Sequence, residues 1–405
     1  MDRPRVLKFG VVGIGNAGGS VLKTIQKESQ IEAVAVADTR PHAREAFEKE
    51  FGGKAYATVE EMYADSEVEA VWIATPNPFH APHTIAAAKA GKHIVVEKPL
   101  ALNLQEAAAM IEAADKNGVK LLSGHTRAFD PPVQTMSQIL KTGEVGELRA
   151  MNVWSFTNWM LRPRMPEEVD VEKGGGVGFR QAPHQIDTLR FLGGGLVKSV
   201  RGMLGTWMEG RMGAPGYYTA YLEFENGMPA TIAYNGYGYF MASELLPWEG
   251  ESAAISPKAR AKTRRELQGG TWNEEAAKDD MRFGGSGRSP LSPGQSGTGN
   301  KEARFLSDLG LLLLTCDRGV LRQGPNGIYV YNNEGVREEP IHMDSATNGG
   351  DPTFDEAYRA IVNNEPIFHD GHWGMATLEV QLALMQSARE HKEISLEHQV
   401  AVPEH

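Results

Sequence analysis

The sequence predicts an α/β domain with a parallel sheet over residues 1–130, followed by an α+β domain with a large, mainly antiparallel open sheet over residues 131–405. Three observations support this prediction. The 405 residues exceed the length that one hydrophobic core usually serves, so two domains are expected. Short β-rich apolar runs alternate with helical patterns up to residue 130, and strand-like runs with period-two alternation dominate the part that follows.

The first domain alternates strands and helices, which is the pattern of a parallel sheet covered by helices. The strands are expected over 6–15, 31–38, 69–76, 93–99 and 120–126. We expect helices over 20–28, 83–91 and 104–118, and the glycines near the ends of the last two are typical of helix C-caps.

The second domain begins with a predicted helix over 133–143 and continues mainly with strands. These strands are expected over 147–156, 197–207, 217–227, 229–239, 311–319 and 327–335, and two helical stretches follow over 354–364 and 377–390. Glu225-Asn226-Gly227 between two strands predicts a hairpin turn. Residues 249–303 are polar and predict a long flexible insertion, in which the Gly-, Ser- and Pro-rich stretch 284–300 is either a lid or a linker.

The charge balance excludes some classes of partner. The chain has 41 basic and 52 acidic residues, a net charge of −11 and no polybasic run, so neither nucleic acid nor an anionic membrane surface is an expected partner. An anionic substrate would need locally placed cations. The single cysteine, Cys316, is expected to be a buried thiol, and no apolar run approaches the roughly 18 residues that span a bilayer. We therefore expect a cytoplasmic protein.

A glycine motif follows the first strand. Gly13, Gly15, Asn16, Ala17 and Gly18 belong to a G-x-G-x-x-G pattern that lies between a strand and a helix, as the dinucleotide-binding fingerprint of the Rossmann fold requires. The first Gly permits the tight turn and the second lets a pyrophosphate approach the backbone, while the helix N-terminus supplies N–H groups. The motif predicts a nicotinamide dinucleotide cofactor.

The second strand ends in an acidic residue. Asp38 lies 20 residues after Gly18, where a carboxylate accepts hydrogen bonds from the adenosine ribose, and this favours NAD. Arg40 is suited to bind a 2′-phosphate or to stack on adenine, so NADP stays open, as does the alternative that Arg40 is a solvated surface charge.

Loops after the third and fourth strands named above should face the cofactor, because ligands bind at the carboxyl edge of such sheets. Thr75, Pro76, Asn77 and His80 lie in the first of these loops. His80 and His83 are three residues apart, but no cysteine or carboxylate cluster completes a metal site, so no metal is expected and surface or capping roles are an alternative.

Glu97-Lys98-Pro99 forms the second loop. Lys98 is the best candidate for a catalytic group, because an amine beside an oxidised nicotinamide can accept a hydroxyl proton as hydride leaves the carbon. The alternative is an exposed lysine in a salt bridge.

The motifs GIGNAG, ATPNPFH, EKP and GGGVGFRQAPHQIDTLRFLGG together resemble those of the family of glucose-fructose oxidoreductase, inositol dehydrogenase and the rhizopine-catabolism (MocA) oxidoreductases. The resemblance covers most of the chain. It implies a Rossmann domain, a β-rich domain whose open sheet often builds homodimers or homotetramers, and catalysis by the EKP lysine with a histidine. These roles map onto Lys98 and His184.

One position departs from the family pattern D-x-G-x-H-x-x-D, because Arg180 replaces the first aspartate ahead of His184 and Asp187. The aspartate commonly handles a polyol hydroxyl in the family, whereas arginine offers a two-pronged donor for a carboxylate. Asp187 either orients His184 or is only its structural neighbour.

Further candidates line the expected substrate pocket. Arg162 and Arg164 lie in a loop of the second domain, and together with Arg180 they would hold a dianion or serve only structural salt bridges. His125 and Arg127 follow the last strand of the first domain and are expected to line the same pocket.

Within the family, the chain is similar to the branch that oxidises cis-dihydrodiols of aromatic carboxylates, such as phthalate 4,5-cis-dihydrodiol. The resemblance implies that hydride removal from a ring carbinol gives a ketone, which tautomerises to a catechol. Two alternatives stay open: a sugar, inositol or glycoside dehydrogenase, and a non-catalytic regulator that binds NAD.

Overall fold

The computed structural model describes residues 5–125, 127–245, 257–285, 309–324, 326–341 and 351–403. Their contacts divide the chain into two compact units. The first unit contains 5–125, 276–285 and 351–378, and the second contains the other described residues. The boundary expected at residue 130 does not include two later segments of the first unit. One of them contributes Phe354 to the core of that unit.

The first unit contains a six-stranded sheet in which every neighbouring pair is parallel, as predicted. Its strand order is β3-β2-β1-β4-β5-β6. Because the order reverses between β1 and β4, the ligand-binding crevice is expected at the carboxyl ends of these two strands. The strands are β1 (Leu7–Val12), β2 (Ile31–Ala37), β3 (Lys54–Tyr56), β4 (Ala70–Ile73), β5 (His93–Glu97) and β6 (Leu121–Gly124).

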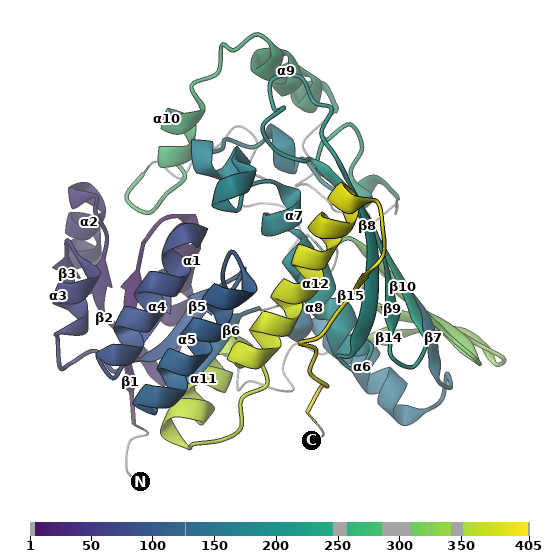
Figure 1. Ribbon diagram of the computed structural model, residues 1–405, viewed down its shortest axis with the longest axis horizontal. Helices are drawn as coiled ribbons and strands as arrows, with labels where there is room; N and C mark the ends of the chain where they lie inside the picture. The colour runs from purple at the N-terminus through teal and green to yellow at the C-terminus, as the bar shows by residue number, and fades with distance from the viewer. Residues whose placement is uncertain are drawn as a thin grey trace. The chain divides into compact units, whose positions relative to one another are not determined.

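Helices cover both faces of this sheet (Figure 1). One face buries Leu22 of α1, Phe47 of α2 and Phe354 of α11, and on the other α4 and α5 lie side by side. Helix α2 could not be predicted from the sequence, because only Ala43 and Phe47 of that helix are buried and two apolar residues give no clear period. The elements are α1 (Asn16–Ile25), α2 (Pro41–Phe51), α3 (Val59–Tyr63), η1 (Asn77–Phe79), α4 (His80–Lys89), α5 (Leu104–Asn117), α11 (Pro352–Val362) and α12 (Gly371–Glu390).

The second unit contains a nine-stranded sheet of order β14-β13-β12-β11-β7-β10-β9-β8-β15. Only the pair of β7 and β10 is parallel among the described strands of this sheet, which confirms the mainly antiparallel prediction. The hairpin turn at Glu225-Asn226-Gly227 is also confirmed, with Gly227 at φ +79°. The strands are β7 (Leu148–Phe156), β8 (Val197–Gly205), β9 (Tyr217–Phe224), β10 (Pro229–Asn235), β11 (Leu311–Cys316), β12 (Gly319–Gln323), β13 (Gly327–Asn332), β14 (Gly335–Pro340) and β15 (Ile394–Ser395).

One face of this second sheet is packed and the other is open (Figure 1). Met136 of α6, Ile186 of α8 and Leu384 of α12 belong to the same buried cluster as the inward side chains of the strands. The helices that begin in this unit are η2 (Arg127–Phe129), α6 (Pro131–Thr142), η3 (Trp159–Leu161), η4 (Pro166–Val169), η5 (Val171–Lys173), α7 (Val177–Arg180), α8 (Ala182–Leu192), η6 (Ala242–Leu245), α9 (Pro257–Gln268) and α10 (Glu274–Asp279). The boundary between the two units falls within α10 and within α12.

Within the expected insertion at 249–303, the described residues 257–285 contain two helices, α9 and α10, that the sequence did not indicate. Leu267 and Phe283 are buried and anchor this otherwise polar stretch. The remainder of the insertion, including all but two residues of 284–300, lies outside the described residues. Cys316 is buried in β11, as predicted. Among the described helices, none has the length and apolar character needed to cross a membrane.

Candidate active site

The glycine loop joins β1 to α1, and glycine suits each of its three positions for a different structural reason. Gly13 has φ +78°, and a Cβ there would lie 3.1 Å from the Ala74 carbonyl oxygen. A Cβ on Gly18 would lie 2.1 Å from the Gly13 oxygen, so this position needs glycine for close packing. A Cβ on Gly15 would meet nothing within 4 Å, so the backbone is open to a ligand there. The loop therefore fits a dinucleotide pyrophosphate.

The first turn of α1 adds to this fit. Gly15 caps the helix without a side-chain hydrogen bond, and Asn16 and Ala17 are exposed. Backbone N–H groups at such a helix start attract an anion, because they lack helical partners and lie at the positive end of the helix dipole.

Asp38 and Arg40 form a fixed pair at the end of β2. Asp38 accepts hydrogen bonds from the Ile14 N–H at 2.9 Å and from Arg40 Nε at 3.0 Å. Burial raises the pKa of Asp38, but hydrogen bonds from Arg40 and Ile14 outweigh burial and lower it. Arg40 Nη2 also donates to the Ile14 carbonyl at 2.9 Å. Arg40 is thus not a solvated surface charge, and both side chains lie beside the glycine loop.

The loop after β4 is tied to the loop after β5 by a histidine. His80 is buried, with Nδ1 2.8 Å from the Pro99 carbonyl oxygen and Nε2 2.9 Å from the Thr75 carbonyl oxygen. His80 is therefore not a surface residue: it ties the two loops together, and its contact with the cofactor stays a prediction. Pro76 is exposed in the same loop and Asn77 is buried. Across the described ranges, no cluster of three His, Cys, Asp or Glu residues is suited to hold a metal ion.

Lys98 follows β5 directly. The next residue, Pro99, is the one whose carbonyl oxygen contacts His80. Lys98 and Glu97 are half-buried. The Glu97 carboxylate accepts a hydrogen bond from Trp72 Nε1 at 3.3 Å, and burial raises the pKa of Glu97 although the charge of Lys98 opposes this shift. This bond ties the carboxyl group to the sheet, and the contact of Glu97 with the cofactor stays a prediction. His125, at the end of β6, is buried in the same unit.

In the second unit, Arg164 is committed to the protein. Its guanidinium lies 3.7 Å from the centre of the Trp159 ring, donates twice to the Trp159 carbonyl at 2.9 and 3.2 Å, and lies 3.4 Å from Glu168. Burial lowers the pKa of Arg164 to about 9, and the charges of neighbouring arginines add to this shift. The donors of Arg164 are thus used within the protein, which favours the alternative of a structural salt bridge over a substrate contact.

Arg180 and Arg162 are more accessible. Arg180 ends α7 and has 23% of its side chain exposed against 7% for Arg164, and its Nη1 lies 3.4 Å from the same Glu168 oxygen that contacts Arg164. Arg162 is half-buried and donates from Nε to Asn158 at 3.0 Å. Glu168, which the sequence analysis missed, therefore lies between two arginines. Arg164 and Arg180 share Glu168, and Arg162 adds a further positive charge, so this loop is suited to an anion.

His184 is half-buried near the start of α8, directly after α7. Asp187, one turn later, is fully buried, and its charge favours protonated Arg190, whose pKa burial lowers to about 9. Asp187 is thus involved with Arg190, and its orienting role toward His184 stays a prediction. Arg127, in η2, lies 3.3 Å from Asp130, and η2 packs against α8. Arg127 and His184 thus lie on neighbouring elements.

A further residue that the sequence did not indicate stabilises the loop that carries Arg162 and Arg164. Arg211 is buried, donates to the carbonyls of Met160 and Arg162 at 3.1 and 3.0 Å, and forms an ion pair with Glu274. No local motif surrounds Arg211 in the sequence, so only the fold reveals this contact.

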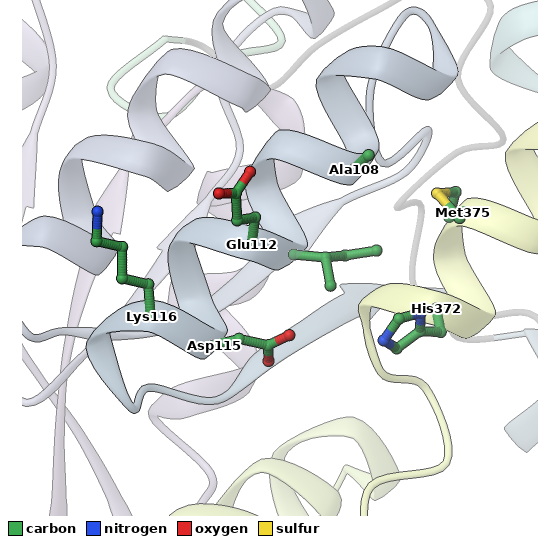
Figure 2. Close-up of a pocket in the computed structure, with 7 residues that line it drawn as sticks. Ala108, Glu112, Asp115, Lys116, His372 and Met375 are labelled. Atoms are coloured by element: carbon green, nitrogen blue, oxygen red, sulfur yellow. The ribbon is translucent and has the colours of Figure 1, made fainter.

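The first unit also has a shallow pocket of about 530 Å³ between α5 and the start of α12 (Figure 2). Ile111 and Met375 supply apolar atoms, and Glu112, Asp115 and Lys116 line it from α5. None of its lining residues belongs to the predicted site. Lys98 and the glycine loop lie in the first unit whereas Arg180 and His184 lie in the second, so their cooperation stays a prediction.

Comparison with known proteins agrees with these features. Residues 7–125 match the model of an oxidoreductase family with an NAD-binding Rossmann fold, and residues 133–240 match the GFO/IDH/MocA C-terminal domain. The chain is 32% identical over 387 residues to 1-carboxy-3-chloro-3,4-dihydroxycyclohexa-1,5-diene dehydrogenase of Comamonas testosteroni, covering 95% of each chain. It is 28% identical over 254 residues to inositol 2-dehydrogenase of Rhizobium meliloti (strain 1021), covering 61% of this chain and 75% of that protein.

A solved structure is similar over nearly the whole chain. The crystal structure of the putative dehydrogenase from Bordetella bronchiseptica RB50 aligns with a TM-score of 0.84 at 34% identity, covering 96% of this chain and 100% of that chain.

Proposed function

Because the chain belongs to the GFO/IDH/MocA oxidoreductase family, and is thus a dehydrogenase with an NAD-binding domain, we propose that it oxidises a ring carbinol of a carboxylated cyclic diol. The proposed substrate class is the cis-dihydrodiols of aromatic carboxylates, such as phthalate 4,5-cis-dihydrodiol. NAD is the proposed physiological acceptor, and NADP is the alternative because Arg40 lies beside Asp38.

The observation that carries this proposal is the partly exposed side chain of Arg180, of which 23% is accessible. It stands on α7 ahead of His184, in a loop where Arg162 adds a second accessible positive charge. A guanidinium binds a carboxylate through two parallel hydrogen bonds, which a neutral polyol cannot accept with equal strength. The Comamonas relative supports the same class, since its name specifies a carboxylated dihydroxycyclohexadiene.

The residues divide the reaction between them. Gly13, Gly15 and Asp38 would hold the dinucleotide, and bound NAD supplies the hydride acceptor. Lys98 takes the hydroxyl proton as general base while the hydride leaves the same carbinol carbon. His184 positions that hydroxyl or relays its proton, and Arg180 anchors the ring carboxylate. The resulting ketone tautomerises to a catechol, and the gain of aromaticity drives the reaction forward.

A substrate panel tests the proposal. Reduction of NAD and NADP would be followed at the nicotinamide absorbance band with phthalate and benzoate cis-dihydrodiols, inositol and several sugars. We expect turnover of carboxylated dihydrodiols. Turnover of polyols alone would overturn the substrate class and favour a sugar or inositol dehydrogenase, to which the Rhizobium relative points. Binding of NADH without turnover of any compound would favour a regulator.

We also propose that the open face of the nine-stranded sheet forms a homodimer or homotetramer interface. Strand register aligns Trp154, Ala233, Thr219 and Met203 in one row across this face, and Tyr221 lies in the neighbouring row. Trp154, Met203 and Tyr221 are exposed, and apolar side chains gathered on one sheet face favour self-association. We place the protein in the cytoplasm, where its single thiol, Cys316, stays reduced.

A further inference from the structure

A segment from late in the chain packs on the dinucleotide side of the first unit. We call residues 276–285 the strap, and they belong to the first unit although the glycine loop lies more than 250 residues earlier. Phe283 anchors the strap: its Cβ lies 3.1 Å from where a Cβ on Gly19 of α1 would be, and its ring centre lies 6.2 Å from that of Phe51 at the end of α2. The strap thus contacts both helices that flank β2.

The strap reaches the glycine loop through Asn16. With the Asn16 amide oriented so that both of its groups find partners, Nδ2 donates to the Met281 carbonyl at 3.0 Å and Lys278 Nζ donates to Oδ1 at 3.3 Å. Asn16 is the first residue of α1, so these contacts place the Lys278 ammonium at the helix start that fits a pyrophosphate. Only 8% of Lys278 is exposed, so its side chain is packed against the protein at this helix start.

The strap also reaches the adenosine end of the same site. The Asp279 carboxylate lies 3.8 Å from Arg40 Nη1 and 3.7 Å from Arg282 Nη1. Because Arg40 is itself bonded to Asp38, the strap borders the pair of residues predicted to meet the adenosine end of the dinucleotide.

We propose that the strap is part of the cofactor site and that Lys278 binds the pyrophosphate of the dinucleotide. The glycine loop and α1 offer only partial charges from N–H groups, and Lys278 adds a full positive charge at their side. This inference rests on the binding of NAD and not on the proposed substrate, so failure of the dihydrodiol assignment leaves it intact.

The test compares two ligands by titration calorimetry on the full chain: ADP-ribose, which contains the pyrophosphate, and adenosine, which does not. For Lys278→Gln we expect on the order of tenfold weaker binding of ADP-ribose and unchanged binding of adenosine, as loss of one charge-assisted hydrogen bond implies. Lys278→Arg should recover most of the affinity. Lys262→Gln, which removes a lysine with 72% of its side chain exposed on α9, should bind as wild type does.

Equal or tighter ADP-ribose binding by folded Lys278→Gln would overturn the proposal, and tighter binding would show instead that the strap obstructs the site. If that variant does not fold, hydrogen exchange of the wild type decides. ADP-ribose should then slow exchange in 276–285 more than adenosine does, and equal exchange with both ligands would refute the assignment.

Discussion

At the scale of single residues, Lys98 carries the proposed chemistry. Its replacement by alanine removes the general base, so kcat should fall by about 10²- to 10⁴-fold while NADH still binds. Steady-state assays measure kcat, and fluorescence titration measures the binding of NADH. Lys54→Ala is the matched control, because Lys54 is an exposed lysine of the same unit. Near-normal turnover in Lys98→Ala would show that another group accepts the proton.

Glu97 gives a prediction for the pH dependence of stability. Because burial raises its folded-state pKa above 4.5, the folded state holds its proton more tightly than the unfolded state. The contribution of protonated Glu97 to the free energy of unfolding is therefore fully present below pH 4.5 and is lost as the pH rises through the folded-state pKa. Glu97→Gln removes this loss, so its free energy of unfolding relative to wild type should increase from pH 4.5 upward. Parallel urea titrations at several pH values would detect it, and a pH-independent difference would contradict it.

At the scale of elements, the segment from η3 to α7 contains arginines with different surroundings. Arg164 is bonded within the protein, and Arg180 is more accessible. Arg164→Met removes one partner of a buried ion pair and leaves Glu168 with less compensation, so the free energy of unfolding should fall by about 3–5 kcal/mol. KM, measured at a temperature at which the variant stays folded, should change little. Chemical denaturation measures the first effect and steady-state kinetics the second. A variant of normal stability with a much higher KM would return Arg164 to the substrate site.

The loops after β4 and β5 show why an element matters more than a motif. The sequence assigns Thr75, His80 and Glu97 to one cofactor-facing edge, and that edge exists. The structure adds that the His80 ring faces two backbone carbonyls and that the Glu97 carboxyl group contacts Trp72, so both side chains stabilise the loops. A motif places a residue at an edge but does not give the direction of its side chain.

At the scale of the whole molecule, features with strong local signals could be predicted. The parallel sheet, the antiparallel sheet and the turn at Gly227 follow from buried apolar runs and turn residues. The helices of 257–285 could not, because Leu267 and Phe283 are isolated apolar residues in a polar stretch. Contacts between distant residues, such as Arg211 with Glu274 or Lys278 with Asn16, leave no periodic pattern and require the fold.

The open sheet face gives a prediction for the assembly. Tyr221→Asp places a charge on the proposed interface, and burying that charge is costly, so the mutant should dissociate toward monomers. Sedimentation velocity over a range of concentrations measures this. Glu225→Lys, a charge change in the turn beyond β9, is the control. A monomeric wild type, or a mutant that stays assembled, would contradict the proposed interface.

Recognition of the substrate carboxylate by Arg180 is tested by comparing kcat/KM for a carboxylated cis-dihydrodiol and for the same compound without its carboxylate, in wild type and in Arg180→Ala. We expect that the wild type prefers the carboxylated compound and that Arg180→Ala loses about 10- to 100-fold in kcat/KM on that compound alone. Arg180→Lys should lie between them, because lysine lacks the planar fork. An equal loss on both compounds, or no loss on either, would show that Arg180 does not recognise a carboxylate.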